Sequence, residues 1–345
     1  MRQRIPTEDI VDSDTGKFKF FWTDFSEIES SLILFGKVRT KKDQFVSAMV
    51  QVSGFNRELY FLPREGKTPS DVHKEIIPLL LDKYGLESLR AKPEKKKYAF
   101  ELPGIPHEAE YLKVLLPFNT PKCKSSAIPS DLQGDTFKHV FGGNTTMFEN
   151  FVIQRKIMGP CWLEISDGDF ESVQGASHCN VEVTVKSPNS ITPTNEKQSP
   201  ALNCVSLAIQ TVMNSKENKQ EIVSISMAVF KNLPQDSSIP KDLKPNEVVT
   251  LVRPPQGSTF PPLLGAKSKK ELPGNVRLFN NEKTLLNCFC ALLKVNDPDV
   301  IIGHRLESVI LDVLAHRAHE LNIPQFSVFG RRMRKSWPDR FGKYN

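Results

Sequence analysis

The sequence lacks the features that mark secreted, membrane-spanning and zinc-binding chains. None of its six cysteines stands in a C-x-x-C spacing, so neither a zinc site nor a disulfide framework is indicated. No apolar run approaches the ~20 residues that a bilayer-spanning helix needs. The first ten residues, MRQRIPTEDI, contain no apolar stretch, so we expect no secretory signal. We therefore expect a soluble intracellular protein with free thiols.

A strong charge of either sign is also missing. The formal net charge is +6 over 345 residues, which permits a polyanionic partner without demanding one. Hydrophobic residues make up 39% of the chain and charged residues 25%, which is ordinary for a globular protein and excludes wholesale disorder. A chain of this length is expected to bury two cores.

The distribution of apolar residues divides the chain into two domains. Residues 1–16 are polar and are expected to be loose. Short apolar strands and two helices, at 70–86 and about 146–155, then indicate an α+β domain over 17–186. Residues 187–199 have almost no apolar mass and are expected to form a linker. The second domain, 200–345, begins with two apolar strands and contains a helix at 282–296.

Two segments of this second domain together carry a family signature. The first is the strand pair in PALNCVSLAIQTVMNSKENKQEIVSISMAVF (200–230), and the second is DPDVIIGH (297–304). The pairing resembles the 3′–5′ proofreading domain of the family B DNA polymerases. YFLPR (60–64) and GPCWL (159–163) are similar to the alpha-type branch of that family. The resemblance implies an RNase H-like α/β domain with a mixed sheet, incomplete at its C-terminal end.

The residues that would make this domain a nuclease are replaced. Relative to the family motif, Ala208 and Gln210 stand in place of Asp and Glu, Arg305 in place of Asn, and Ile310 in place of Asp. Two-metal hydrolysis needs several carboxylates converging on two cations roughly 3.5–4 Å apart. Alanine offers no metal ligand and a glutamine amide offers only a weak one. We therefore predict no catalytic residue, no metal site and no cofactor in this chain.

Two basic clusters are candidates for nucleic-acid binding. Cations beside an aromatic residue suit a sequence-independent grip on phosphates. For both clusters the competing interpretation is an ordinary solvated charged face. The candidates are Arg331, Arg332, Arg334 and Lys335 with Trp337, and Lys95, Lys96 and Lys97.

The resemblance also implies a function for the protein to which this sequence corresponds. It would be the N-terminal portion of a nuclear, DNA-directed DNA polymerase that extends RNA primers on a DNA template during replication. Its protein partners would be a primase and an accessory subunit, and no contact with a membrane is expected. The polymerase residues, and the magnesium they need, are expected beyond Asn345. This chain would then act as a scaffold and nucleic-acid contact. Two alternatives remain: an active 3′–5′ exonuclease domain of another family B polymerase, and a non-enzymatic protein-interaction module.

Overall fold

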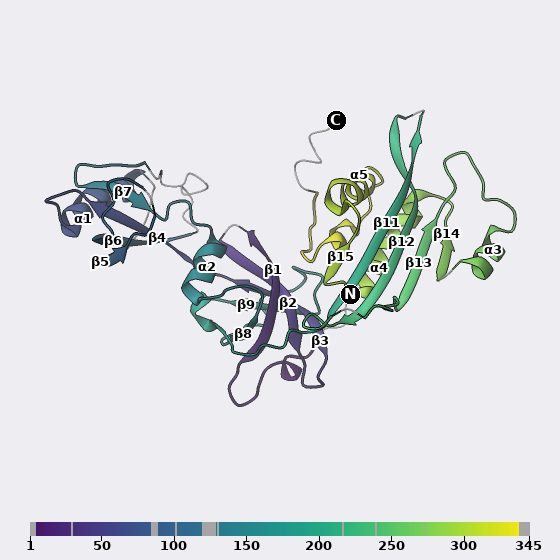
Figure 1. The fold of residues 1–345 in the computed structure, drawn as a ribbon, viewed down its shortest axis with the longest axis horizontal. Coiled ribbons are helices and arrows are strands. Elements are labelled where there is room, and N and C mark those ends of the chain that lie inside the picture. Colours follow the sequence, from purple (N-terminus) through teal and green to yellow (C-terminus); the bar gives the residue numbers. More distant parts are fainter. Residues whose placement is uncertain are drawn as a thin grey trace.

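Three β-sheets follow one another along the molecule (Figure 1). The structure, a computed structural model, describes residues 5–337 except 29, 84–88, 101, 119–128, 130, 216, 239 and 273. Within that part of the chain no helix is long and apolar enough to cross a membrane. Five cysteines lie there and all are unbridged, while Cys123 lies outside the described residues.

The central body is a six-stranded sheet that packs around helix α2 (Met147–Arg155). Its strands, in the order β10-β8-β1-β2-β3-β9, bury a continuous apolar core. Helix α2 begins with a capping box, in which the Thr146 hydroxyl accepts from the backbone of Glu149 and the Glu149 carboxylate accepts from Thr146 N–H. The strands are β1 (Phe18–Ile28), β2 (Ser31–Arg39), β3 (Phe45–Val52), β8 (Trp162–Ile165), β9 (Val181–Val185) and β10 (Ile191–Pro193).

Strand β10 differs from the sequence-based expectation, because it lies inside the segment predicted to be a linker, 187–199. The only aliphatic residue of that segment, Ile191, is fully buried in the six-stranded core. It anchors β10 against β8 at the sheet edge, a position that tolerates Pro193. The connection between the two predicted domains is therefore shorter than the composition indicated.

The second body is a four-stranded sheet in the order β5-β6-β4-β7, formed by residues between β3 and α2. The sequence indicated one α+β unit over 17–186, whereas the structure builds two sheets there. Helix α1 (Pro69–Pro78), followed by a π-helical turn (Leu79–Lys83), covers one face of the sheet. The strands are β4 (Asn56–Pro63), β5 (Arg90–Lys97), β6 (Glu108–Pro117) and β7 (Phe137–Phe141).

The third body is a five-stranded sheet in the order β14-β13-β12-β11-β15. The pairs β11–β12 and β12–β13 are antiparallel, and β13–β14 and β11–β15 are parallel, so the predicted mixed sheet is confirmed. Helices α4 (Glu282–Asn296) and α5 (Asp312–Glu320) contribute to the core on one face. The remaining elements are β11 (Leu202–Asn214), β12 (Lys219–Leu233), β13 (Glu247–Val252), α3 (Leu264–Glu271), β14 (Asn275–Leu278) and β15 (Val300–Ile302).

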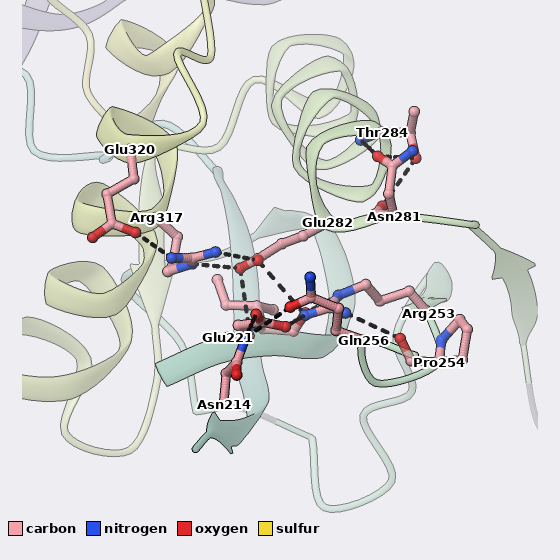
Figure 2. Close-up of polar contacts among 11 residues, drawn as sticks. Asn214, Glu221, Arg253, Pro254, Gln256, Asn281, Glu282, Thr284, Arg317 and Glu320 are labelled. Atoms are coloured by element: carbon pink, nitrogen blue, oxygen red, sulfur yellow. Dashed lines mark hydrogen bonds and ion pairs between the residues drawn. The ribbon is translucent and has the colours of Figure 1, made fainter. Parts of the chain in front are cut away.

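A buried ionic network joins these strands to both helices (Figure 2). Arg253 Nη2 lies 2.7 Å from a Glu221 carboxylate oxygen and 3.6 Å from one of Glu282. Arg317 Nη2 lies 2.6 Å from the Glu282 carboxylate and also pairs with Glu320. The same Glu282 carboxylate accepts from the backbone N–H of Ile222 at 2.9 Å. Glu282, at the start of α4, is thus the centre that holds β12, β13 and α5 together.

We predict that Arg317→Met lowers the free energy of unfolding by about 3–5 kcal/mol, because Glu282 would stay buried with one cation fewer. Chemical denaturation measures the loss. Lys219→Met is the matched control, since Lys219 pairs with Glu320 at 3.7 Å on the surface and its removal should cost no more than ~1 kcal/mol. Equal losses in the two variants would contradict the central role of Glu282.

Candidate nucleic-acid interface

The nuclease positions of β11 lie on the sheet face opposite the helices. Leu207 and Ile209 pack into the core. Ala208 and Gln210 alternate with them along the strand, so they point outward and are exposed. Their cross-strand partners on β12 are Ser226 and Ser224. The face on which metal-binding carboxylates would gather therefore presents a methyl group, an amide and two hydroxyls.

The helical nuclease position is sealed in the core. Ile310 is only 5% exposed and belongs to the apolar cluster beneath the five-stranded sheet. A Cβ at Gly303 would meet its side chain at 3.0 Å, so β15 and the turn Leu306–Leu311 approach closely here. Arg305 is exposed and holds a left-handed backbone conformation with φ of 52°. Among the described residues, no three His, Cys, Asp or Glu side chains gather to hold a metal.

The acidic residues of the DPD motif, Asp297 and Asp299, contact the six-stranded sheet and so join two bodies of the molecule. Asp299 Oδ2 lies 2.7 Å from Lys37 Nζ of β2, and both side chains are at most 6% exposed. The same oxygen accepts from Asn203 N–H, and Lys37 also donates to the Ala201 carbonyl. Asp297 accepts from the Ser47 hydroxyl of β3 at 2.7 Å. These contacts connect the six-stranded sheet to the edge of the five-stranded sheet.

Arg331, which the sequence predicted as a nucleic-acid contact, also belongs to this joint. Its guanidinium pairs with Asp297 and with Asp299, the latter at 2.9 Å, and donates to the Pro298 carbonyl. Burial alone would lower the pKa of Arg331, but the two carboxylates outweigh it and the pKa is raised. Its charge is therefore neutralised inside the protein.

Sequence reasoning missed Lys37 and Ser47, although one signal was present. Lys37 interrupts the apolar run SLILFGKV, and a lysine in a buried strand needs an internal anion. In the sequence the DPD motif indicates only membership of a family. No short-range pattern predicts its contact with β2, which lies some 260 residues earlier.

Beside the joint, a cavity of about 340 Å³ opens between the six-stranded sheet and the third body. The backbone of residues 331–333 forms one wall, since His178 N–H donates to the Arg331 carbonyl and Met333 N–H to the Ala176 carbonyl. The lining combines cations, aromatic rings and hydroxyls with two carboxylates, those of Asp24 and Asp299. It includes Thr23, Phe25, Ser327, Arg332, Arg334 and Trp337.

Trp337 lies at this cavity but is partly occupied by packing. Its ring stacks on Phe326 with centroids 3.9 Å apart and meets the His319 ring edge-on at 5.2 Å. These two contacts cover part of the indole surface. Arg334 and Lys335 are exposed next to it. We call the cavity together with Arg334 and Lys335 the interdomain groove.

The second predicted basic cluster does not extend this groove. Lys95, Lys96 and Lys97 lie on β5, in the four-stranded sheet at the opposite end of the molecule from the five-stranded sheet (Figure 1). All three are exposed. The two clusters predicted from the sequence are thus separate surfaces.

Comparison with known proteins agrees with this architecture. The model of the family B DNA polymerase exonuclease domain matches residues 138–344. The chain belongs to the family B DNA polymerases. A solved family B DNA polymerase from the hyperthermophilic archaeon Pyrobaculum calidifontis shares the fold, with a TM-score of 0.56, 12% identity, and coverage of 89% of this chain and 33% of that one.

Within the family, the relatives are of the alpha type. The chain is 62% identical over 341 residues to the DNA polymerase alpha catalytic subunit of Saccharomyces cerevisiae, covering 99% of this chain and 23% of that protein. It is 34% identical over 344 residues to the DNA polymerase alpha catalytic subunit of Xenopus laevis, covering 94% of this chain and 23% of that one. The alpha-type resemblance predicted from the sequence is confirmed, and the chain spans about a quarter of the length of these relatives.

We predict that restoring carboxylates is tolerated on β11 and damaging on the helix. Ala208→Asp with Gln210→Glu should change the free energy of unfolding by no more than ~0.5 kcal/mol, because both positions are exposed. Ile310→Asp should cost about 3 kcal/mol or more, since it removes a buried aliphatic group and buries a carboxyl. Ile310→Val, expected to cost only ~0.5–1.5 kcal/mol, is the control.

A 3′–5′ exonuclease assay tests whether the replaced residues leave any nuclease activity. With magnesium or manganese, the unaltered chain should release no nucleotide from a 3′-labelled single strand, because the donor set at Ala208, Gln210 and Ile310 cannot hold two cations. Hydrolysis that disappears in a Glu307→Ala variant would contradict this.

Proposed function

We propose that this chain is the non-catalytic front portion of an alpha-type replicative DNA polymerase. The whole polymerase would extend RNA primers on a DNA template in the nucleus, together with a primase and an accessory subunit. Within that polymerase, this chain would act as a scaffold that fixes the N-terminal sheets and the nuclease-like domain relative to each other. The family assignment supports the polymerase context, and the replaced carboxylates support a scaffold rather than a proofreading site.

A divalent cation does not fit the residues of the nuclease-like face. Ala208 and Gln210 offer one neutral amide oxygen between them, and Ile310 is buried among apolar side chains. Hard cations such as Mg²⁺ prefer carboxylate and carbonyl oxygens with water. We therefore derive no hydrolytic step from this face, and we assign any magnesium of the whole polymerase to its polymerase residues.

The observation that carries the proposed nucleic-acid contact is the interdomain groove. It places exposed Arg334 and Lys335 beside an aromatic wall that includes Phe25 and Trp337. Cations attract phosphates without reading sequence, and aromatic faces stack bases of any identity. We assign to the groove a weak, salt-sensitive contact with unpaired template or primer strand.

We predict that Arg334→Ala with Lys335→Ala weakens single-strand binding and flattens its salt dependence. If each cation neutralises one phosphate, the slope of log affinity against log salt should become less negative by about 1.4. Fluorescence anisotropy with an oligo(dT) probe, titrated between about 50 and 200 mM salt, measures the slope. Lys269→Ala with Lys270→Ala, two exposed lysines of α3, is the charge-matched control.

An unchanged slope in the groove variant would move the contact elsewhere. If the unaltered chain showed no salt-dependent binding at all, a protein-interaction module would replace the nucleic-acid contact as the role of this region.

A further inference from the structure

The four-stranded sheet has a second face that α1 does not cover. Leu112 and Val114 of β6 point into the core beneath α1. Alternation along the strands therefore turns Tyr111 and Lys113 to the opposite face. Lys113 lies opposite Tyr60 of β4, and Tyr60 in turn lies opposite Phe141 of β7. This face runs across all four strands, since Glu94 of β5 lies opposite Tyr111.

Aromatic rings form a connected cluster on this face. Tyr98 lies 5.6 Å from Phe141, centroid to centroid, and Tyr111 and His139 each lie 6.0 Å from Phe141. Phe100 completes the cluster 5.7 Å from Tyr98. Tyr111 is only 3% exposed, so it forms the floor, whereas Phe100 is 80% exposed and forms the outer edge.

Cations surround the rings. Lys96 Nζ lies 5.1 Å and Lys113 Nζ 5.5 Å from the centroid of Tyr60, within cation–π range. The adjoining edge strand, Arg90–Lys97, carries five cations and one anion, Glu94. Glu94 pairs with Lys96 at 2.8 Å and with Lys92 at 3.3 Å. Glu58 pairs with Lys113 at 2.9 Å, so on this face three lysines, Lys92, Lys96 and Lys113, stand against two carboxylates and leave a small positive excess beside the rings.

The ordinary explanation covers only part of these features. Lysines on an edge strand prevent unwanted strand pairing, which would account for Lys95 and Lys97. It does not account for a phenylalanine held four-fifths in solvent at the end of a five-ring cluster. A single exposed hydrophobic residue is ordinary, but a contiguous cluster of rings that reaches solvent is a mark of a binding surface.

We propose that this face is a second site for single-stranded nucleic acid, separate from the interdomain groove. A base stacks on Phe100 and Tyr98, and Lys92 and Lys96, which strand alternation places on the same face as Glu94, pair with the flanking phosphates. The solvent-exposed part of this face, where Tyr98 and Phe100 lie beside the β5 lysines, offers the two contacts that sequence-independent strand binding needs. We call it the aromatic face. It goes beyond the proposed role of the groove and does not depend on it.

Binding is measured on the 345-residue chain carrying Arg334→Ala and Lys335→Ala, so that the groove contributes least. The probes are fluorescein-labelled oligo(dT) and oligo(U), which separate DNA from RNA. In this background, Phe100→Ala should weaken binding about five- to a hundredfold, the range expected for loss of one stacked base. Lys92→Ala with Lys96→Ala should make the salt slope less negative by about 1.4. Lys269→Ala with Lys270→Ala should change neither.

Crosslinking supplies the second readout. An oligo(U) carrying a photoreactive base should crosslink within residues 98–111, and Phe100→Ala should remove that crosslink while leaving the thermal midpoint unchanged. Binding that survives both aromatic-face variants overturns the inference and leaves the proposed function standing. If Arg334→Ala with Lys335→Ala alone abolishes binding, the inference is likewise overturned and the proposed function stands. Equal displacement by poly-glutamate of matched charge would assign the face to an acidic protein instead.

Discussion

The buried ion pair between Lys37 and Asp299 is the interaction on which the arrangement of this molecule depends. Both charges are withdrawn from water, a costly step that only good geometry and additional hydrogen bonds offset. Asn203 N–H, the Ala201 carbonyl and the guanidinium of Arg331 supply those bonds. Because Lys37 belongs to β2 and Asp299 directly precedes β15, the pair fixes one sheet against the edge of another.

The joint also gives acidic residues of the nuclease-like domain a structural role. The Asp and Glu of the strand motif would face solvent and metal, and their replacement by Ala208 and Gln210 leaves the core untouched. Ile310 has joined the core, and Glu282 anchors the sheet to both helices from within. Asp297 and Asp299 of the DPD motif, by contrast, bind side chains of the six-stranded sheet and so fix its position. Asp297 and Asp299 thus serve the joint, whereas positions 208, 210 and 310 carry no carboxylate.

Local signals in the sequence predicted local structure well. Helix α4 was expected over 282–296 and has those bounds, because the Asn281 side chain caps it and its apolar residues recur at helical spacing. The two long strands β11 and β12 were expected for similar reasons. Strand β5 forms over 90–97, a segment whose lysines and proline have little β propensity, because pairing with β6 decides there.

The site was less predictable, because it depends on partners distant in the chain. The exposure of Ala208 and Gln210 followed from strand alternation, but the burial of Ile310 depended on β15. Arg331 and Arg334 looked equivalent in the sequence, whereas only Arg331 meets Asp297 and Asp299. The ring cluster around Phe141 collects residues from β6, β7 and the segment after β5, and no spacing rule connects them.

A double-mutant cycle between Lys37 and Asp299 tests the central claim most directly. The free energy of unfolding is measured for Lys37→Met, for Asp299→Asn and for the double variant. Each single change should cost about 3–5 kcal/mol, because each leaves a buried charge without its main partner. The double variant should cost less than their sum, giving a coupling free energy of about 2–3 kcal/mol. Strictly additive losses would show that the two residues act independently and would contradict the joint.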